Sequence, residues 1–229
     1  MTAAALQKDP SLSHSGFRQQ AQPVQAVVFD LGGVLTTGLT EALLVLVGRY
    51  GQPVPPQEVL AVWSPLYIAA TLGRLHPDEL WRQFRQKVDL GSLPPGREEA
   101  VFLSAVHLRE PDAGDTLAGL QQRYTLGLLS NHVARWAYTL LDHFSLRLCF
   151  QAVAISSEIG ARKPDLRTYQ RICQALSIAP ERAVYIADEE EDLVGCQAAG
   201  MVPIFIPGED ACSRVGLPIA RLSDLLLIL

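Results

Sequence analysis

VQAVVFDLGGV, residues 24–34, is the stretch that decides the fold. Its apolar, β-branched run ends at Asp30, a pattern that is typical of a strand buried on both faces of a parallel sheet. The pair Gly32-Gly33 then breaks the strand into a tight turn. A carboxylate therefore follows a buried strand, at the kind of position where open α/β sheets bind their ligands.

From about Leu39 to His107 the hydrophobic periodicity is helical, and no strand pattern interrupts it. We expect helices over residues 39–50, 56–72, 77–88 and 96–108. Pro56 and Pro77 each suit the first turn of a helix, and Gly51 and Gly73 suit helix ends. The region is predicted to be a compact helical insertion.

Beyond Pro111 strands and helices alternate. The expected strands are 124–129, 152–155, 183–187 and 201–206, and the expected helices are 113–123, 133–144, 165–176, a segment ending at 199, and 222–229. Alternation predicts βαβ units, right-handed crossovers and a parallel sheet. The predicted fold is α/β: a Rossmann-like parallel-sheet core, residues 24–37 and 110–229, with a helical domain, residues 38–109, inserted after the first strand. Residues 1–23 are interpreted as a mobile N-terminal extension.

Composition excludes several classes of protein. The chain has 229 residues, of which 48% are hydrophobic and 19% charged, and this excludes a disordered protein. A net charge of −5 argues against a nucleic-acid partner. No apolar run approaches the ~18 residues of a membrane span. The four cysteines form no CxxC pair and no signal peptide is recognisable, so we expect a cytoplasmic protein, monomer or homodimer, with no membrane partner.

Polar residues stand where the predicted strands end. They are Asp30, Ser130, Asn131, Asp188 and Asp192, together with Lys163 before a helix. Because the carboxyl ends of parallel strands meet at one edge of the sheet, we expect these side chains to converge. Carboxylates suit Mg²⁺, and a metal ion with a lysine can neutralise a phosphoryl group during its transfer. A carboxylate can also be the nucleophile, and backbone N–H groups can bind phosphate oxygens.

Four segments in this order resemble the motifs of the haloacid dehalogenase (HAD) superfamily. They are VFDLGGVL (28–35), LLSN (128–131), GARKPD (160–165) and ADEEED (187–192). The resemblance covers about residues 25–207. The helical insertion lies where that superfamily carries its helical type 1 cap. Residues 73–81, GRLHPDELW, are similar to a cap segment of the glucose-1-phosphatase-like and epoxide-hydrolase N-terminal branches.

The resemblance implies a Mg²⁺ site and a nucleophile. Asp30 would be the nucleophile and a metal ligand, and Gly32 would offer its backbone carbonyl to the metal. Asp188 would complete the metal site, and Asp192 would support it from nearby. These roles are implied by the matching motif positions.

The resemblance also implies a site for the phosphoryl group. Ser130 and Asn131 would hold its oxygens, together with the backbone around Gly33, and Lys163 would offset negative charge. The aromatic residues Trp63, Tyr67 and Trp81 are expected to build the core of the helical insertion. Contact of one of these three aromatic residues with the substrate is the less favoured alternative.

The sequence departs from the superfamily pattern at Gly32. Hydrolytic members commonly place a second Asp there, which protonates the leaving oxygen and then activates water, work typically worth ~10²–10⁴-fold in rate. We predict a Mg²⁺-dependent phosphatase that acts on a small phosphorylated metabolite through an aspartyl-phosphate on Asp30. One alternative is a non-catalytic phosphate-binding or regulatory protein. A less favoured alternative is a 2-haloacid dehalogenase, because those relatives need no metal and usually carry Ser where this chain has Asp188.

Overall fold

The computed structural model of the chain describes residues 23–208 and 213–229. Almost all of the expected N-terminal extension, residues 1–23, lies outside the described residues. The centre of the fold is a six-stranded, all-parallel sheet in the order β3-β2-β1-β4-β5-β6. Its strands are β1 (Ala26–Phe29), β2 (Thr125–Ser130), β3 (Ala152–Ile155), β4 (Ala183–Ala187), β5 (Val202–Phe205) and β6 (Leu217–Pro218). The predicted α/β class and parallel sheet are confirmed.

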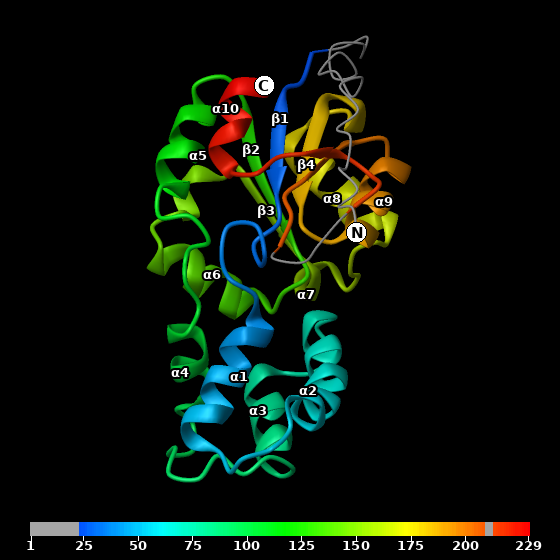
Figure 1. The fold of residues 1–229 in the computed structure, drawn as a ribbon. Coiled ribbons are helices and arrows are strands. Elements are labelled where there is room, and N and C mark those ends of the chain that lie inside the picture. The colour runs from blue at the N-terminus through cyan, green and yellow to red at the C-terminus, as the bar shows by residue number, and fades with distance from the viewer. Residues whose placement is uncertain (1–22, 209–212) are drawn as a thin grey trace, which may run out of the picture.

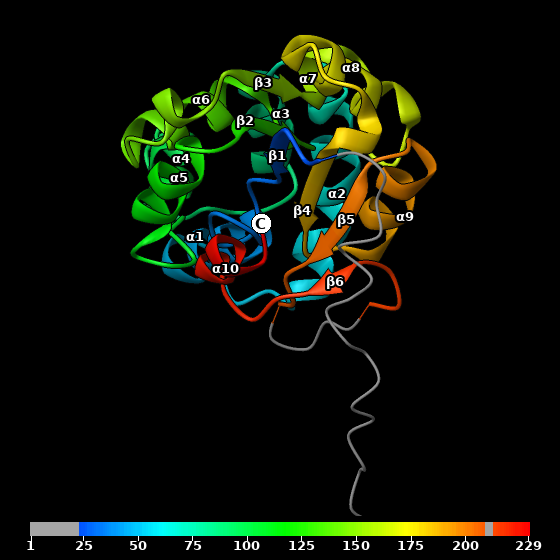
Figure 2. The ribbon, with the colours of Figure 1, turned by 90° about the horizontal axis from the view of Figure 1, so that it is seen from above.

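Helices cover both faces of the sheet (Figure 2). On one side lie α5 (Ala113–Gln121), α6 (Ala134–His143) and α10 (Leu225–Ile228), and on the other α8 (Leu166–Leu176) and α9 (Glu190–Ala198). Successive residues of β1 alternate between the two faces, as strand geometry requires. Val27 and Phe29 belong to the apolar cluster that includes α5 and α6, whereas Ala26 and Val28 belong to the cluster that includes α8. The strand is buried on both sides, which explains its unbroken apolar sequence.

A second group of helices lies beyond one end of the sheet (Figure 1). It consists of α1 (Leu39–Tyr50), α2 (Pro56–Thr71), α3 (Pro77–Arg85) and α4 (Glu98–Ser104). The chain enters and leaves this group through two paired segments, because the N–H of Thr37 donates to the carbonyl of His107 at 2.9 Å. The N–H of Arg109 likewise donates to the carbonyl of Leu35 at 3.0 Å. Both connections therefore lie side by side, next to the end of β1.

The helical group and the sheet domain share an aromatic cluster. Trp136 of α6 is fully buried, and its ring lies 6.1 Å from that of Trp63 and nearly parallel to it, at 9°. The ring of Phe102 lies 5.3 Å from Trp136 and that of Trp81 lies 6.0 Å away. The aromatic core expected from Trp63, Tyr67 and Trp81 therefore takes its central residue from the sheet domain.

Short elements differ most from the sequence-based expectation. The helix expected over 96–108 covers only Glu98–Ser104, because residues after it form the connection back to the sheet. The helix α7 (Ser156–Ile159) and the strand β6 were not expected, since four and two residues are too short to show a period. The helix expected over 222–229 is a 3₁₀ turn, η4 (Leu222–Asp224), followed by α10; the other 3₁₀ turns are η2 (Arg147–Cys149) and η3 (Pro180–Arg182).

Among the described residues, none of the helices has both the length and the apolar character that crossing a bilayer requires. The longest, α2, has 16 residues.

Candidate active site

The carboxyl ends of β1, β2 and β4 face a cavity of about 520 Å³. All eight residues that the sequence singled out line it: Asp30, Gly32, Gly33, Ser130, Asn131, Lys163, Asp188 and Asp192. Trp63 and Tyr67 of α2 line the same cavity from the helical group, and Trp81 does not. The structure therefore brings the separate motifs together at the sheet edge that the sequence predicted.

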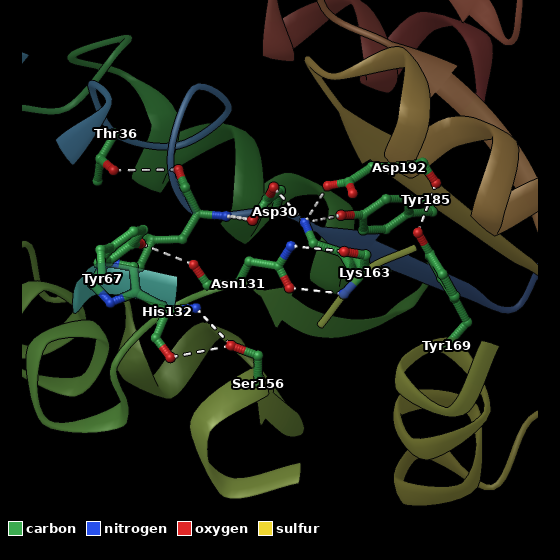
Figure 3. Close-up of polar contacts among 11 residues, drawn as sticks. Asp30, Thr36, Tyr67, Asn131, His132, Ser156, Lys163, Tyr169, Tyr185 and Asp192 are labelled. Atoms are coloured by element: carbon green, nitrogen blue, oxygen red, sulfur yellow. Dashed lines mark hydrogen bonds and ion pairs between the residues drawn. The ribbon is translucent and has the colours of Figure 1, made fainter. Parts of the chain in front are cut away.

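Lys163 lies at the centre of the polar contacts (Figure 3). Its ammonium lies 2.5 Å from Oδ2 of Asp30 and 2.6 Å from Oδ2 of Asp192, and it donates to the hydroxyl of Tyr185 at 2.6 Å. Burial alone would lower the pKa of Lys163, but the charges of Asp30 and Asp192 outweigh it and raise that pKa. The side chain is 1% exposed, so the site holds a permanent, fixed cation.

Asp30 has both carboxylate oxygens fixed. Its backbone N–H donates to the carbonyl of Ile186 at 3.0 Å, which continues the pairing of β1 with β4 through this residue. Oδ1 accepts a hydrogen bond from the N–H of Leu31 at 2.7 Å, and Oδ2 faces Lys163. The carboxylate is thus oriented before any ligand binds, and it lies on the cavity wall.

Asp188 follows β4 and lies against the turn that follows Asp30. Burial, followed by the negative charges of Asp30 and Glu189, raises the pKa of Asp188 to about 7. Gly33 has a φ of +75°, and a Cβ at Gly33 would collide with the Asp188 carboxylate. The close approach of the two loops therefore requires glycine at position 33.

The backbone of Gly33 is engaged within the protein. Its N–H donates to the carbonyl of Thr36 at 2.8 Å, and its carbonyl accepts from the guanidinium of Arg109. The backbone around Gly33 was expected to receive phosphoryl oxygens, and in this structure the N–H of Gly33 itself closes the turn with Thr36. Because it has no side chain, Gly33 leaves space for the carboxylate of Asp188.

The two adjacent glycines form a matched pair for a stability test. Gly33→Ala is expected to destabilise the fold by about 1–3 kcal/mol, because the φ is unfavourable for alanine and the new Cβ displaces Asp188. Gly32→Ala is expected to leave stability nearly unchanged, since a Cβ there meets no atom within 4 Å and the φ is not positive. Urea denaturation of both variants measures the difference, and equal stabilities would contradict the assignment.

Asn131 holds the Lys163 loop. Its Oδ1 accepts from the N–H of Lys163 at 2.8 Å and its Nδ2 donates to the carbonyl of Lys163 at 3.1 Å. Its own carbonyl accepts from the hydroxyl of Tyr67 at 3.0 Å. The side chain was expected to hold phosphoryl oxygens, but its contacts in the structure are with the chain. Ser130, at the end of β2, is buried and lines the cavity.

The loop after Asn131 rests on α7. Ser156 accepts a hydrogen bond from the N–H of His132 at 3.0 Å and donates to the carbonyl of His132 at 3.2 Å. Burial lowers the pKa of His132 to about 4, so the imidazole is neutral at pH 7. Nδ1 of His132 lies 3.0 Å from the carbonyl of Val133, which fixes the proton on Nδ1.

Sequence reasoning missed two residues that support the site. Tyr185, which contacts Lys163, stands in the apolar strand β4 and resembles an ordinary core residue in the sequence. Arg109 was expected only as the last residue of the helical insertion, yet its guanidinium contacts the carbonyls of Gly33 and Pro207. Neither role carries a local sequence signal, because both depend on contacts between distant segments.

The charges on the cavity wall do not balance. Five carboxylates line the cavity, from Asp30, Glu41, Asp188, Glu189 and Asp192, against three cations, from Arg109, Arg162 and Lys163. In the described part of the chain, no three His, Cys, Asp or Glu side chains are arranged as a ready-made metal cluster. The oxygen donors at hand are carboxylates and a backbone carbonyl, a set that suits Mg²⁺, which binds one or two carboxylates and keeps several waters.

The chain is similar to one protein family and to several phosphatases. A family model described as haloacid dehalogenase-like hydrolase matches residues 105–206. The chain is 29% identical over 191 residues to Phosphatase MT3486 of Mycobacterium tuberculosis, covering 78% of this chain and 85% of that protein. It is 28% identical over 123 residues to a glyceraldehyde 3-phosphate phosphatase of Methanothermobacter thermautotrophicus, and this match covers 50% of the chain but only 54% of that relative's length.

Solved structures share the fold over most of its length. A crystal structure of a dehalogenase superposes with a TM-score of 0.69 at 18% identity, covering 90% of this chain and 97% of that chain. The HAD family enzyme bt-2542 of Bacteroides thetaiotaomicron, solved in complex with magnesium and inorganic phosphate, has a TM-score of 0.69 at 17% identity and covers 82% of this chain and 96% of that chain. Residues 105–206 are therefore similar to the haloacid dehalogenase-like hydrolases, and the parallel sheet with four motifs meeting at one cavity agrees with that similarity.

Proposed function

We propose that the chain is a Mg²⁺-dependent phosphatase that hydrolyses a small phosphorylated metabolite through an aspartyl-phosphate on Asp30. The observation that carries the proposal is the contact between Asp30 and Lys163 on the cavity wall, at 2.5 Å. One carboxylate oxygen of Asp30 is fixed by a backbone N–H, and the carboxylate is held next to a buried cation. Such an anion is suited to attack phosphorus, since the lysine offsets the charge that the attack brings together.

The proposal gives the residues of the site three roles: they hold the metal ion, receive the phosphoryl group or position Lys163. Asp30, Asp188 and the carbonyl of Gly32 hold the metal ion, while Ser130 and the backbone at Asn131 receive the phosphoryl oxygens. Asp192 holds Lys163, which is the contact that the structure gives it. The side chain of Asn131 positions the Lys163 loop through its two hydrogen bonds.

The excess of negative charge supports the need for a divalent cation. Five carboxylates against three cations would repel a phosphate dianion in a partly dehydrated cavity. A bound Mg²⁺ offsets that charge and polarises the phosphoryl group. The magnesium and phosphate in the bt-2542 structure support the same chemistry for this site.

We further propose that residues 38–109 act as a cap over the reaction. Trp63 and Tyr67 of α2 lie on the cavity wall, and Tyr67 contacts the carbonyl of Asn131. A cap of this kind excludes bulk water and selects the leaving group. The small-metabolite assignment rests on the cavity volume of about 520 Å³.

Dehalogenation is the less favoured alternative. Similarity in fold to a dehalogenase at 18% identity carries no activity by itself. A haloacid carboxylate entering without a metal would meet the same excess of negative charge. Release of halide from 2-chloropropionate in the presence of EDTA would support this alternative, and we expect none.

The proposal is tested by measuring the hydrolysis of 4-nitrophenyl phosphate in the presence of Mg²⁺ and in the presence of EDTA. Turnover is expected with Mg²⁺ and is expected to be lost in EDTA and restored by added Mg²⁺, since the cation is needed to offset the wall carboxylates. Circular dichroism in EDTA checks that the fold persists. Turnover that is unaffected by EDTA would overturn the metal assignment, and tight phosphate binding without turnover would favour a regulatory protein.

A further inference from the structure

At Gly32 the cavity wall has unfilled space for a side chain. It lies two residues after Asp30, lines the cavity, and a Cβ built there meets no atom within 4 Å. Its backbone conformation is open to other residues, because its φ is not positive. The glycine is therefore not required by packing, in contrast to Gly33, and the space beside the nucleophile lacks a side chain.

Four other proton donors on the wall are engaged in contacts within the protein, while the carboxyl groups of Glu41, Asp188 and Glu189 line the same cavity, and Asp188 is assigned to the metal ion. The hydroxyl of Tyr67 donates to the carbonyl of Asn131, and burial raises its pKa well above the usual value. His132 is neutral with its proton directed to the carbonyl of Val133. Lys163 is held by two carboxylates and a hydroxyl, and Arg109 by two backbone carbonyls.

We propose that the enzyme supplies no proton to the leaving group, and that its substrates are therefore phosphates whose leaving group departs as a stable anion, such as acyl, enol, aryl or anomeric phosphates. This inference rests on the proposed phosphatase function and narrows its substrate class. Simple alkyl phosphates, such as those of primary alcohols, are excluded as good substrates because an alkoxide is a poor leaving group without protonation.

The balance of the reaction follows from this assignment. A carboxylate oxygen of Asp30 forms a bond to phosphorus, the bond from phosphorus to the bridging oxygen breaks, and its electron pair leaves on that oxygen. The leaving group takes its proton from solvent after departure. A water molecule then forms a bond to phosphorus, releases a proton to solvent, and the aspartyl oxygen–phosphorus bond breaks to restore the Asp30 carboxylate.

The cap wall is consistent with a ring-shaped leaving group. The rings of Trp63 and Tyr67 are stacked, with centroids 5.6 Å apart and an angle of 12° between planes. Both residues line the cavity, so the stacked pair places aromatic side chains on the wall of the proposed site. Aryl phosphates are therefore both suitable probes and members of the proposed class.

The test uses substituted phenyl phosphates and an alkyl phosphate, with kcat/KM as the readout because it reports the step in which the leaving group departs. For the natural chain, kcat/KM is expected to fall steeply as the phenolate becomes less stable, and to be lower for the alkyl phosphate by about the 10²–10⁴-fold that general acid catalysis supplies. A flat dependence across the series would overturn the inference, since it would show that another residue, such as Glu41 or Glu189, protonates the leaving group.

Gly32→Asp and Gly32→Asn are the matched variants. The readout is kcat/KM for the alkyl phosphate divided by kcat/KM for 4-nitrophenyl phosphate. Gly32→Asp is expected to raise this ratio by about 10-fold or more. Gly32→Asn introduces a side chain of the same shape without an acid, and it is expected to leave the ratio unchanged. An equal gain with Asn would overturn the inference. Asp30→Asn separates the two proposals: hydrolysis that survives it refutes the phosphatase mechanism, whereas hydrolysis that requires Asp30 but has a flat leaving-group dependence refutes only the substrate class.

Discussion

Replacing Asp30 with Asn is expected to reduce phosphatase turnover by about 10⁴-fold or more, the scale seen when a nucleophile is removed from an enzyme. The amide is a poor nucleophile, and it removes one of the two negative charges that face Lys163. Lys163 keeps its contact with Asp192 and its hydrogen bond to Tyr185, so the fold is expected to persist. Steady-state hydrolysis of 4-nitrophenyl phosphate measures the loss.

Two comparisons make this result specific. Asp142→Asn changes an exposed acid of α6 that pairs with Arg147 outside the cavity, and it is expected to leave turnover unchanged. Acid-quenched natural protein is expected to carry a phosphoryl group on the peptide that contains Asp30, detectable by mass spectrometry. Retained turnover in Asp30→Asn, or a phosphoryl group on another residue, would contradict the assignment.

The fold could be predicted wherever hydrophobic periodicity extends over enough residues. The helix Leu39–Tyr50 and the strands Ala152–Ile155 and Ala183–Ala187 match the sequence-based ranges at both ends. The helix Ser156–Ile159 could not be predicted, because four residues do not reveal a helical period. Its position was decided by contacts, since Ser156 binds the loop around His132.

The sequence could predict where the candidate site lies, but it could not predict the hydrogen bonds among its residues. Parallel strands deliver their carboxyl ends to one edge, so Asp30, Ser130 and Asp188 were expected to converge. The sequence could not show that Tyr185 turns its hydroxyl to Lys163, because every second residue of a buried strand faces the same way whatever its polarity. Nor could it show that the amide of Asn131 binds the Lys163 backbone, since 32 positions separate the two residues.

The second large effect is expected on stability, at the contact between the helices α1–α4 and the sheet domain. Trp136 is fully buried in α6, and the rings of Trp63, Trp81 and Phe102 lie 6.1, 6.0 and 5.3 Å from its own. Trp136→Ala is expected to lower the free energy of unfolding by about 3–5 kcal/mol, because it leaves a large cavity between the two parts. At ~2–4 °C per kcal/mol for a chain of this size, calorimetry should show a clear fall in Tm.

The indole nitrogen of Trp136 sharpens this prediction. In the described structure Nε1 of Trp136 is buried without a hydrogen-bond partner, so Trp136→Phe removes an unsatisfied N–H along with part of the ring. Trp136→Phe is therefore expected to lower the free energy of unfolding much less than Trp136→Ala does, because the aromatic contacts largely remain. Leu148→Ala, at a residue that is 94% exposed, serves as the surface control and is expected to change stability by no more than about 0.5 kcal/mol. If Trp136→Phe proved as destabilising as Trp136→Ala, the indole N–H would have to be bonded in solution, and the aromatic contacts would not be what joins the helices α1–α4 to the sheet domain.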